Sequence, residues 1–271
     1  MELDNPRSVN DFDTEEGLLM ALKNTGLKAN FHDIARDFPK PRILPLDESD
    51  SMSEASFEPN DQLDWVISNY NAELSETQSL EEELKRLQVL KSYLILDSEK
   101  EGNFERLTAL ASRMFKVPIC LVSLVDLGRQ WFMSNRGLGD VKETPRKLAF
   151  CAHAIISKED LLIIPDATKD ARFKDNPLVT GPPFIRFYGG APLICPEGYK
   201  LGTLCLIDDK ARPEGMSLED KQNLRELAAL VMDAMVERRR DKHRMLQDKS
   251  QIIATTAHDL LTPLSGVQMS H

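Results

Sequence analysis

Residues 117–126 of the 271-residue chain read VPICLVSLVD, and this stretch decides the fold class. The apolar residues before it recur at helical spacing, and Val117 and Pro118 stop that helix, because proline removes a helical hydrogen bond and disfavours helical geometry in the residue before it. The run that begins at Ile119 is rich in isoleucine, leucine and valine, which is typical of a strand. The stretch therefore predicts that the chain passes here from helices into a sheet.

Further strands are expected downstream, because short apolar runs recur between turn-forming residues. They cover residues 130–135, 161–164, 191–195 and 201–208. The last two are joined by Pro-Glu-Gly-Tyr at 196–199, which has the spacing of a hairpin turn. Residues 166–188 are dense in Pro, Asp, Arg and Gly, and so long a loop in a compact domain is usually functional.

Three helices are expected around these strands. One begins near Ser79, where Ser79 and Glu82 have capping-box spacing, and a second covers 104–115. A third, long helix begins at Ser217. Its apolar positions alternate four and three residues apart, as in a two-stranded coiled coil, and Arg238 and Lys242 interrupt them; they are Leu224, Ala228, Val231, Met235, Met245 and Ile252. This pattern predicts a homodimer formed through residues 217–264.

The charge of the chain is uneven. The net charge is -10, yet residues 1–78 hold 17 acidic and 6 basic residues (-11), whereas residues 79–271 hold 27 and 28 (+1). We interpret residues 1–78 as an acidic, mostly disordered arm, and a partner-docking arm is the alternative. No nucleic-acid partner is expected, because the chain lacks the basic footprint that such binding needs.

Neither a secretory signal nor a membrane span is apparent, since the longest apolar stretch, 119–125, is far shorter than the roughly 20 residues that cross a bilayer. The four cysteines form no Cys-x-x-Cys pair. We therefore expect reduced thiols in a cytoplasmic protein.

The order of elements from 104 to 208, helix, strands, long loop, hairpin and helix, resembles a GAF domain of bacterial signalling proteins. The amino-acid sequence is similar as well. The similar stretches are residues 117–126, 130–132, 150–155, 175–179, 185–193 and 201–208. The resemblance implies an α+β fold, in which helices pack on one face of an antiparallel sheet and loops close a ligand cavity on the other.

Residues 252–264, IIATTAHDLLTPL, resemble the H-box of histidine kinases. The resemblance makes His258 the phospho-acceptor, and a neutral imidazole is a competent nucleophile toward a γ-phosphoryl group. Asp259 would orient and activate the imidazole. Thr262 matches the position associated with phosphatase control, and Pro263 predicts a bend beside His258. The sequence departs from the family at Ala257, Asp259 and Leu261, and the last of these replaces a basic residue.

The sequence therefore divides into the arm (1–78), a GAF domain with its leading helix (79–216), a signalling helix (217–250) and the start of a dimerisation and phospho-acceptor domain (251–271). We expect the sensory part of a two-component phosphorelay histidine kinase, in which a small ligand or redox state controls His258 and phosphate passes to a receiver-domain Asp. No glycine-rich nucleotide loop occurs in the sequence. ATP would therefore be bound by a kinase domain absent from these residues, in cis or in trans.

Candidate ligand-binding residues of the GAF domain are Cys151, His153, Arg172 and Arg186. The first two suit a covalent tetrapyrrole or a metal, but Cys-Ala-His is not the Cys-His dipeptide of bilin-binding GAF domains, and we predict no metal. Arg172 and Arg186 could bind an anion or pair with nearby aspartates. The alternatives are a GAF-fold thiol enzyme like the free-methionine-sulfoxide reductases, with Cys151 as nucleophile, and a kinase-less GAF dimerisation module.

Overall fold

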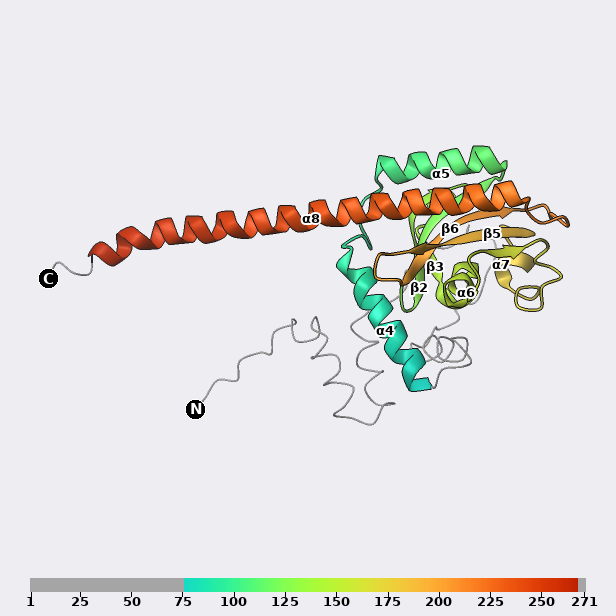
Figure 1. The fold of residues 1–271 in the computed structure, drawn as a ribbon, viewed down its shortest axis with the longest axis horizontal. Coiled ribbons are helices and arrows are strands. Elements are labelled where there is room, and N and C mark those ends of the chain that lie inside the picture. The colour runs from blue at the N-terminus through green and yellow to red at the C-terminus, as the bar shows by residue number, and fades with distance from the viewer. Residues whose placement is uncertain (1–75, 268–271) are drawn as a thin grey trace.

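The computed structural model describes residues 76–267, and these form an α+β domain from which one long helix projects (Figure 1). The predicted arm lies almost entirely outside this range. The helices are α4 (Glu76–Ser92), α5 (Gly102–Phe115), α6 (Phe150–Ile156), α7 (Pro177–Thr180) and α8 (Leu218–Val267), with a 3-10 turn at Arg146–Leu148. The strands are β1 (Ile119–Val125), β2 (Arg129–Arg136), β3 (Glu143–Pro145), β4 (Leu162–Ile164), β5 (Phe187–Ile194) and β6 (Lys200–Asp208).

The six strands form one antiparallel sheet in the order β3-β2-β1-β6-β5-β4. The predicted α+β fold with an antiparallel sheet is confirmed. The strands β3 and β4 at the two edges have three residues each, and β3 was not predicted. The region expected to be a loop at 166–188 holds the short helix α7 and the first two residues of β5.

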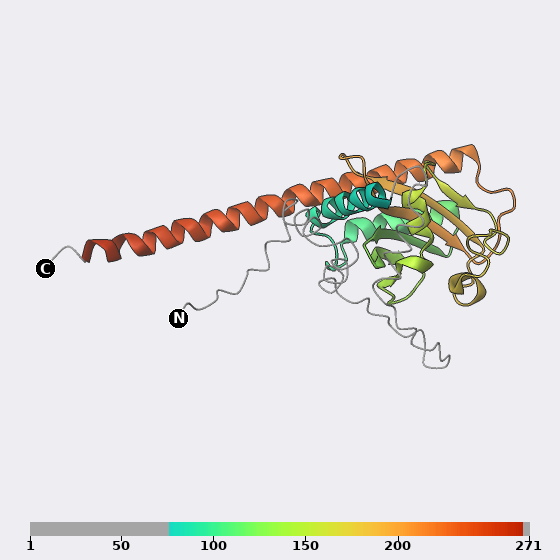
Figure 2. The ribbon, with the colours of Figure 1, turned by 90° about the horizontal axis from the view of Figure 1, so that it is seen from below.

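Both faces of the sheet are buried, and the residues of each strand alternate between two cores. In β1, Cys120, Val122 and Leu124 belong to one core, and Ile119, Leu121 and Val125 belong to the other. Figures 1 and 2 show α5 and α8 side by side over the first face. The helix α6 lies against the second face, so helices cover both faces, whereas the resemblance implied helices on one face only.

The start of α8 belongs to the domain core. Leu224, Val231 and Met235 have no exposed surface, and Ala228 is 4% exposed. The interpretation of these four positions as a coiled-coil seam is therefore wrong. Burial against the domain's own sheet and burial in a coiled coil produce nearly the same spacing of apolar residues. Ser217 does cap this helix as predicted, since its hydroxyl accepts a hydrogen bond from the backbone N–H of Asp220 at 3.0 Å.

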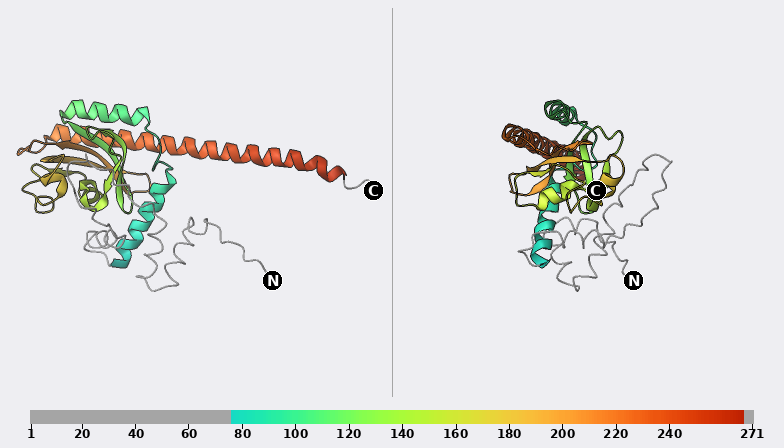
Figure 3. Two further views of the ribbon diagram at one scale, coloured as in Figure 1. Left: turned by 180° about the vertical axis from the view of Figure 1, so that it is seen from behind. Right: turned by 90° about the vertical axis from the view of Figure 1, so that its right-hand side faces the viewer.

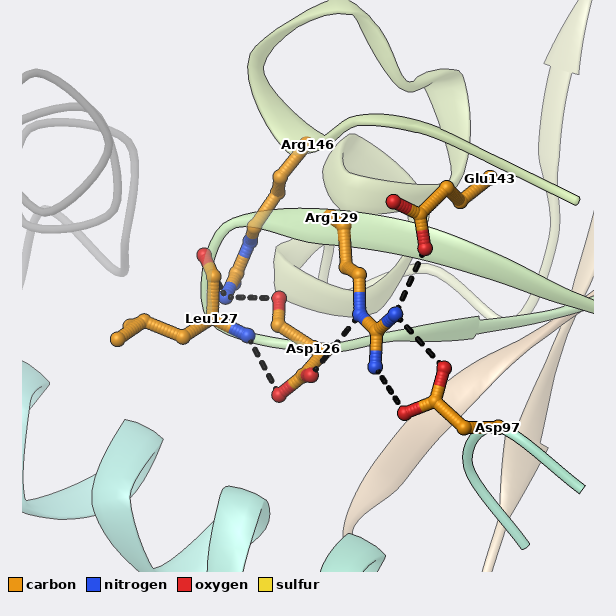
Figure 4. Close-up of polar contacts among 6 residues, drawn as sticks. All are labelled: Asp97, Asp126, Leu127, Arg129, Glu143 and Arg146. Carbon is orange, nitrogen blue, oxygen red and sulfur yellow. Dashed lines mark hydrogen bonds and ion pairs between the residues drawn. The ribbon is translucent and has the colours of Figure 1, made fainter. Parts of the chain in front are cut away.

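A buried ion cluster fixes α4 to the domain. Glu83 lies on α4 and is fully buried, and its carboxylate pairs with Arg146 at 2.5 Å and with Arg86 at 2.6 Å. Burial alone would raise the pKa of Glu83 from its ordinary value of 4.5, but Arg146 and Arg86 outweigh it and lower that pKa to about 2. Arg146 also donates to the carbonyl oxygens of Asp126 and Leu127, and thereby joins α4 to the turn after β1 (Figure 4).

A second cluster surrounds Arg129 at the start of β2 (Figure 4). Its guanidinium pairs with Asp97 at 2.6 Å, Glu143 at 2.7 Å and Asp126 at 3.3 Å. These carboxylates come from the α4–α5 connection, from β3 and from the end of β1. The cluster therefore holds three separate segments at one corner of the sheet.

Replacing Glu83 with Gln should lower the free energy of unfolding by about 3 kcal/mol, because it removes the carboxylate from two buried guanidinium groups. Glu82→Gln is the matched control, since Glu82 is exposed on the same helix turn. Ionised Glu83 stabilises the folded chain above pH 4.5, and this contribution is lost as the pH falls from 4.5 toward 2. The difference between wild type and Glu83→Gln in urea unfolding should shrink over that range; equal stabilities of the two variants at pH 7 would contradict the assignment.

Candidate functional site: a buried thiol beside a small cavity

Cys151 lies in the first turn of α6, where its side chain points at the second face of the sheet and is 1% exposed. Three hydroxyls from three different strands donate hydrogen bonds to its Sγ. They are Thr203 Oγ1 of β6 at 2.9 Å, Ser123 Oγ of β1 at 3.2 Å and the Tyr188 hydroxyl of β5 at 3.3 Å. The strand register brings these groups together, because Ser123 pairs directly with Thr203 across β1 and β6.

A second cysteine completes the cluster. Cys205 of β6 is two residues from Thr203 and faces the same side, and its Sγ lies 3.7 Å from Cys151 Sγ. Both thiols are free in the structure. The other two cysteines, Cys120 and Cys195, are buried in the core on the opposite face of the sheet.

The two sulfur atoms differ in acidity. Burial alone would raise the pKa of the Cys151 thiol, but hydrogen bonds from Cys205, Ser123, Thr203 and Tyr188 lower it to about 7. The pKa of Cys205 is raised, because its hydrogen bond to Cys151 favours the protonated thiol and burial adds to this effect. Cys151 is therefore the more acidic thiol of the pair.

A cavity of about 40 Å³ adjoins Cys151. Side chains of β1, β2, β3, β5, β6, α6 and the α7 region line it, and no charged residue is among them. Its polar lining consists of Gln130, Thr144, Cys151 and Tyr188, and the buried Thr144 Oγ1 has no hydrogen-bond partner. A cavity needs roughly 10 to 15 Å³ to hold one water molecule, so this one admits only a few atoms.

Glycine at position 190 makes room for the Tyr188 ring. The two residues face the same side of β5, and a Cβ on Gly190 would lie 2.3 Å from the Tyr188 hydroxyl oxygen. The phenol therefore lies over the strand, where its hydroxyl reaches Cys151.

The other predicted ligand-binding residues lie outside the cavity lining. The His153 ring packs edge-on against Phe173 at 4.8 Å, and burial together with the positive charge of Arg172 lowers the pKa of the imidazole to about 4. Arg172 makes a two-point ion pair with Asp170, at 2.9 and 2.7 Å. Arg186 donates to the carbonyl oxygens of Val179 and Ile185. The predicted anion-binding role of the two arginines stays a prediction.

The predicted phospho-acceptor segment lies on α8. His258, Asp259 and Thr262 all fall within this helix, which continues past Pro263 to Val267, while their side chains lie outside the described part of the structure. The domain, whose residues line the cavity, lies at one end of α8, and the helix runs from it toward the segment at the other end (Figures 1 and 3). The helix α8 therefore connects the two predicted sites.

Arg238 marks the point where α8 leaves the domain. Its guanidinium pairs with Glu101 and donates to the carbonyl oxygens of Tyr93 and Leu94, at 3.2 and 2.9 Å. The next residue, Arg239, pairs with Glu197 of the β5–β6 hairpin at 2.6 Å, and its guanidinium lies over the Tyr93 ring. We call Arg238 and Arg239 with these partners the exit joint. Beyond it, residues 240–253 of α8 are exposed.

Comparison with known proteins identifies the class. Residues 100–235, half of the chain, match the GAF domain family, so the chain belongs to this family. A cyclic di-GMP phosphodiesterase of Pseudomonas aeruginosa is 45% identical over 138 residues, which are 51% of this chain and 23% of that protein. The chain thus spans less than a quarter of the length of that curated relative.

Two solved structures are similar to about half of this chain. A domain of a putative two-component sensor histidine kinase from Sinorhizobium meliloti has a TM-score of 0.43 at 16% identity, over 54% of this chain and 97% of that one. The free methionine-R-sulfoxide reductase of Neisseria meningitidis also has a TM-score of 0.43, at 17% identity, over 59% of this chain and 93% of that one.

Residues 76–267 contain neither a candidate membrane span nor a candidate metal site. No helix in this range is long and apolar enough to cross a membrane. Within the same range, no three His, Cys, Asp or Glu side chains gather in a way that could hold a metal ion.

The sequence indicates Cys151 as a site residue but not the groups around it, which are Ser123, Tyr188, Thr203 and Cys205. Strand alternation carried part of the signal, because Thr203 and Cys205 are two residues apart on one strand and must share a face. The missing information was the register between β1 and β6 and the position of α6 over them.

Tyr188→Phe should raise the pKa of the Cys151 thiol, because it removes one of the hydrogen bonds that stabilise the thiolate. The pH dependence of thiolate absorbance near 240 nm would report this, in a chain where Cys120 and Cys195 are replaced by Ser. Tyr199→Phe is the matched control, since Tyr199 does not contact the cluster. A midpoint that does not move in Tyr188→Phe would contradict the assigned hydrogen bond.

Proposed function

We propose that this chain is the sensory part of a two-component phosphorelay protein, in which the GAF domain controls phosphorylation of His258. The observation that supports it best is the continuity of α8. Its residues from Leu224 to Met235 are part of the domain core, and the same helix contains residues 252–264, which resemble an H-box. A change inside the domain can therefore reach His258 without crossing a flexible linker.

The exit joint is the place where the GAF domain would act on the exposed part of α8. Before Arg238, α8 is fixed by burial. After it, within residues 76–253, a few side-chain contacts join the helix to the domain, among them His243 Nε2 with the carbonyl oxygen of Ser92 at 3.0 Å. A small rotation or shift of the buried part would alter these contacts and turn the exposed part. In this proposal the turned helix presents His258 to an ATP-bound kinase domain or withholds it.

The chemistry at His258 is phosphoryl transfer. A neutral imidazole attacks the γ-phosphorus of ATP in line, Asp259 holds the other ring nitrogen protonated, and the phosphoryl group then passes to a receiver-domain Asp. The ATP-binding domain and the receiver are partners that other residues or other chains supply.

A homodimer through α8 is part of the proposal. Beyond the exit joint the helix exposes large apolar side chains at 51–69% of their surface, at Met245, Leu246, Ile252 and Ile253. The pairs are seven residues apart, which is the repeat of a coiled coil. An isolated helix of this composition gains little in water, so a second copy of α8 is the occupant that this repeat favours.

The relative from Pseudomonas aeruginosa supports a regulatory role for the GAF domain. That protein is named for a different activity, and the match of 138 residues covers under a quarter of it. A segment shared by proteins with different outputs is better explained as a common input than as a common catalytic domain. Whether this chain controls a kinase, as the H-box sequence favours, or another output is decided by the labelling experiment below.

A thiol enzyme is the second candidate, and one observation favours it. The depressed pKa of Cys151 and the neighbouring Cys205 are the two features that such an enzyme needs. The cavity argues against a free-methionine-sulfoxide substrate, because an amino acid of about ten heavy atoms exceeds the few atoms that fit, and its charged ends would need charged or strongly polar partners. A kinase-less dimerisation module with an unused cavity is the third candidate.

His258→Ala should abolish phosphorylation of the full-length gene product. Labelling with γ-³²P-ATP would measure this, and the wild-type label should be lost in acid and kept in alkali, as phosphohistidine requires. His32→Ala, outside the H-box, is the control and should keep the label. Acid-stable label, or label that survives His258→Ala, would overturn the site assignment.

Replacing Ile252 and Ile253 together with Lys should weaken dimerisation at least about tenfold, which corresponds to about 1.4 kcal/mol, because it places like charges where the two helices meet. Sedimentation equilibrium of the 271-residue chain measures the dissociation constant. The control is the pair Ser250→Lys and Gln251→Lys, which adds the same charge at exposed polar positions. Equal dissociation constants for the two variants would exclude a dimer contact at Ile252 and Ile253.

A further inference from the structure

Cys151 and Cys205 form a pair whose function neither the fold family nor the H-box explains. Their sulfur atoms are 3.7 Å apart, and a disulfide requires about 2.05 Å, so side-chain rotation can bring them most of the way. One thiol comes from a helix and the other from a central strand, so a bond between them would join two layers of the domain.

The surroundings prepare the two sulfurs for different roles. Three hydroxyls donate to Cys151 Sγ and stabilise it as a thiolate, which is the nucleophilic form. Cys205 is placed to attack Cys151 afterward. The cavity reaches Cys151 but not Cys205, so a small oxidant would meet Cys151 first.

We propose that Cys151 and Cys205 are a peroxide-sensing dithiol, in which hydrogen peroxide enters the cavity and converts the pair into a disulfide. The inference specifies the input of the sensor proposed above, and it concerns these two residues alone. A cavity of about 40 Å³ suits a molecule with two heavy atoms.

The chemistry takes place in two steps. First, Cys151 thiolate attacks one peroxide oxygen; an S–O bond forms, the O–O bond breaks, and the leaving hydroxide is protonated to water. Second, Cys205 sulfur attacks Cys151 sulfur; the S–S bond forms, the S–O bond breaks, and the hydroxide takes the Cys205 proton to give a second water. The two thiols are oxidised by two electrons in total, and one peroxide is reduced to two waters.

The disulfide would act on α8 through β6. Cys205 faces α6, while its neighbours Leu204 and Leu206 point to the other face and belong to the core that includes Leu224 and Val231 of α8. Drawing Cys205 toward α6 would therefore shift the side chains on which the buried part of α8 rests.

The test uses the reduced 271-residue chain, exposed to hydrogen peroxide, denatured and labelled with N-ethylmaleimide. Intact mass should change from four labels to two, and peptide mapping should find the cross-link between Cys151 and Cys205. In Cys205→Ser the product should be a sulfenic acid at Cys151, trapped by dimedone. The variant with Cys120→Ser and Cys195→Ser is the matched control and should change from two labels to none.

Four labels after a peroxide dose that oxidises glutathione would overturn the proposal, and so would a cross-link to Cys120 or Cys195. The mapping of wild-type chain needs no variant, so a poorly folded Cys205→Ser leaves the test intact. Phosphorylation is not part of the readout. A failure here therefore leaves the role of His258 standing, and loss of the His258 assignment leaves the thiol chemistry standing.

Discussion

The burial of both faces of β6 is the constraint on which the rest of the structure depends. This strand lies between β1 and β5 and has no exposed residue from Leu201 to Asp208. Gly202 allows β1 to approach closely, because a Cβ there would lie 1.9 Å from the carbonyl oxygen of Ser123. Alternate residues of β6 then serve two cores: Thr203 and Cys205 meet α6, and Leu204 and Leu206 meet the core that holds α8. The thiol cluster and α8 are thus separated by the thickness of one strand.

The same packing gives α8 the rigid attachment that its proposed signalling role requires. A helix attached to the domain only through its first residue would move independently of the domain. The helix α8 instead contributes buried side chains to the domain core, at positions between Leu224 and Met235. Interiors of proteins are close-packed and transmit displacement rather than absorb it. Beyond Arg238 the helix has no such support in the described residues, so any change of its orientation is set by the buried turns and by the exit joint.

The sequence predicted the fold well where its elements were long and strongly patterned. The apolar runs gave all the strands except β3, and the capping signal at Ser217 located the last helix. The strand β3 and the helix α7 have only three and four residues, too few for a recognisable period. The seam from Leu224 to Met235 was misassigned because periodicity shows that a face is buried and does not show what buries it. At the site, Cys151 was identifiable, but its pairing with Cys205 depends on strand register and on the position of α6.

The energetics of the exit joint fit a switch. Two arrangements of α8 can interconvert under a signal only if their free energies differ by a few kcal/mol, since a tenfold change in population corresponds to about 1.4 kcal/mol. Arg238 makes one ion pair and two hydrogen bonds to backbone carbonyls there, and hydrogen bonds to charged groups contribute about 1.5–3 kcal/mol each. Losing one such contact without replacement would therefore change the population by about tenfold or more, and the signal need not unfold any part of the domain.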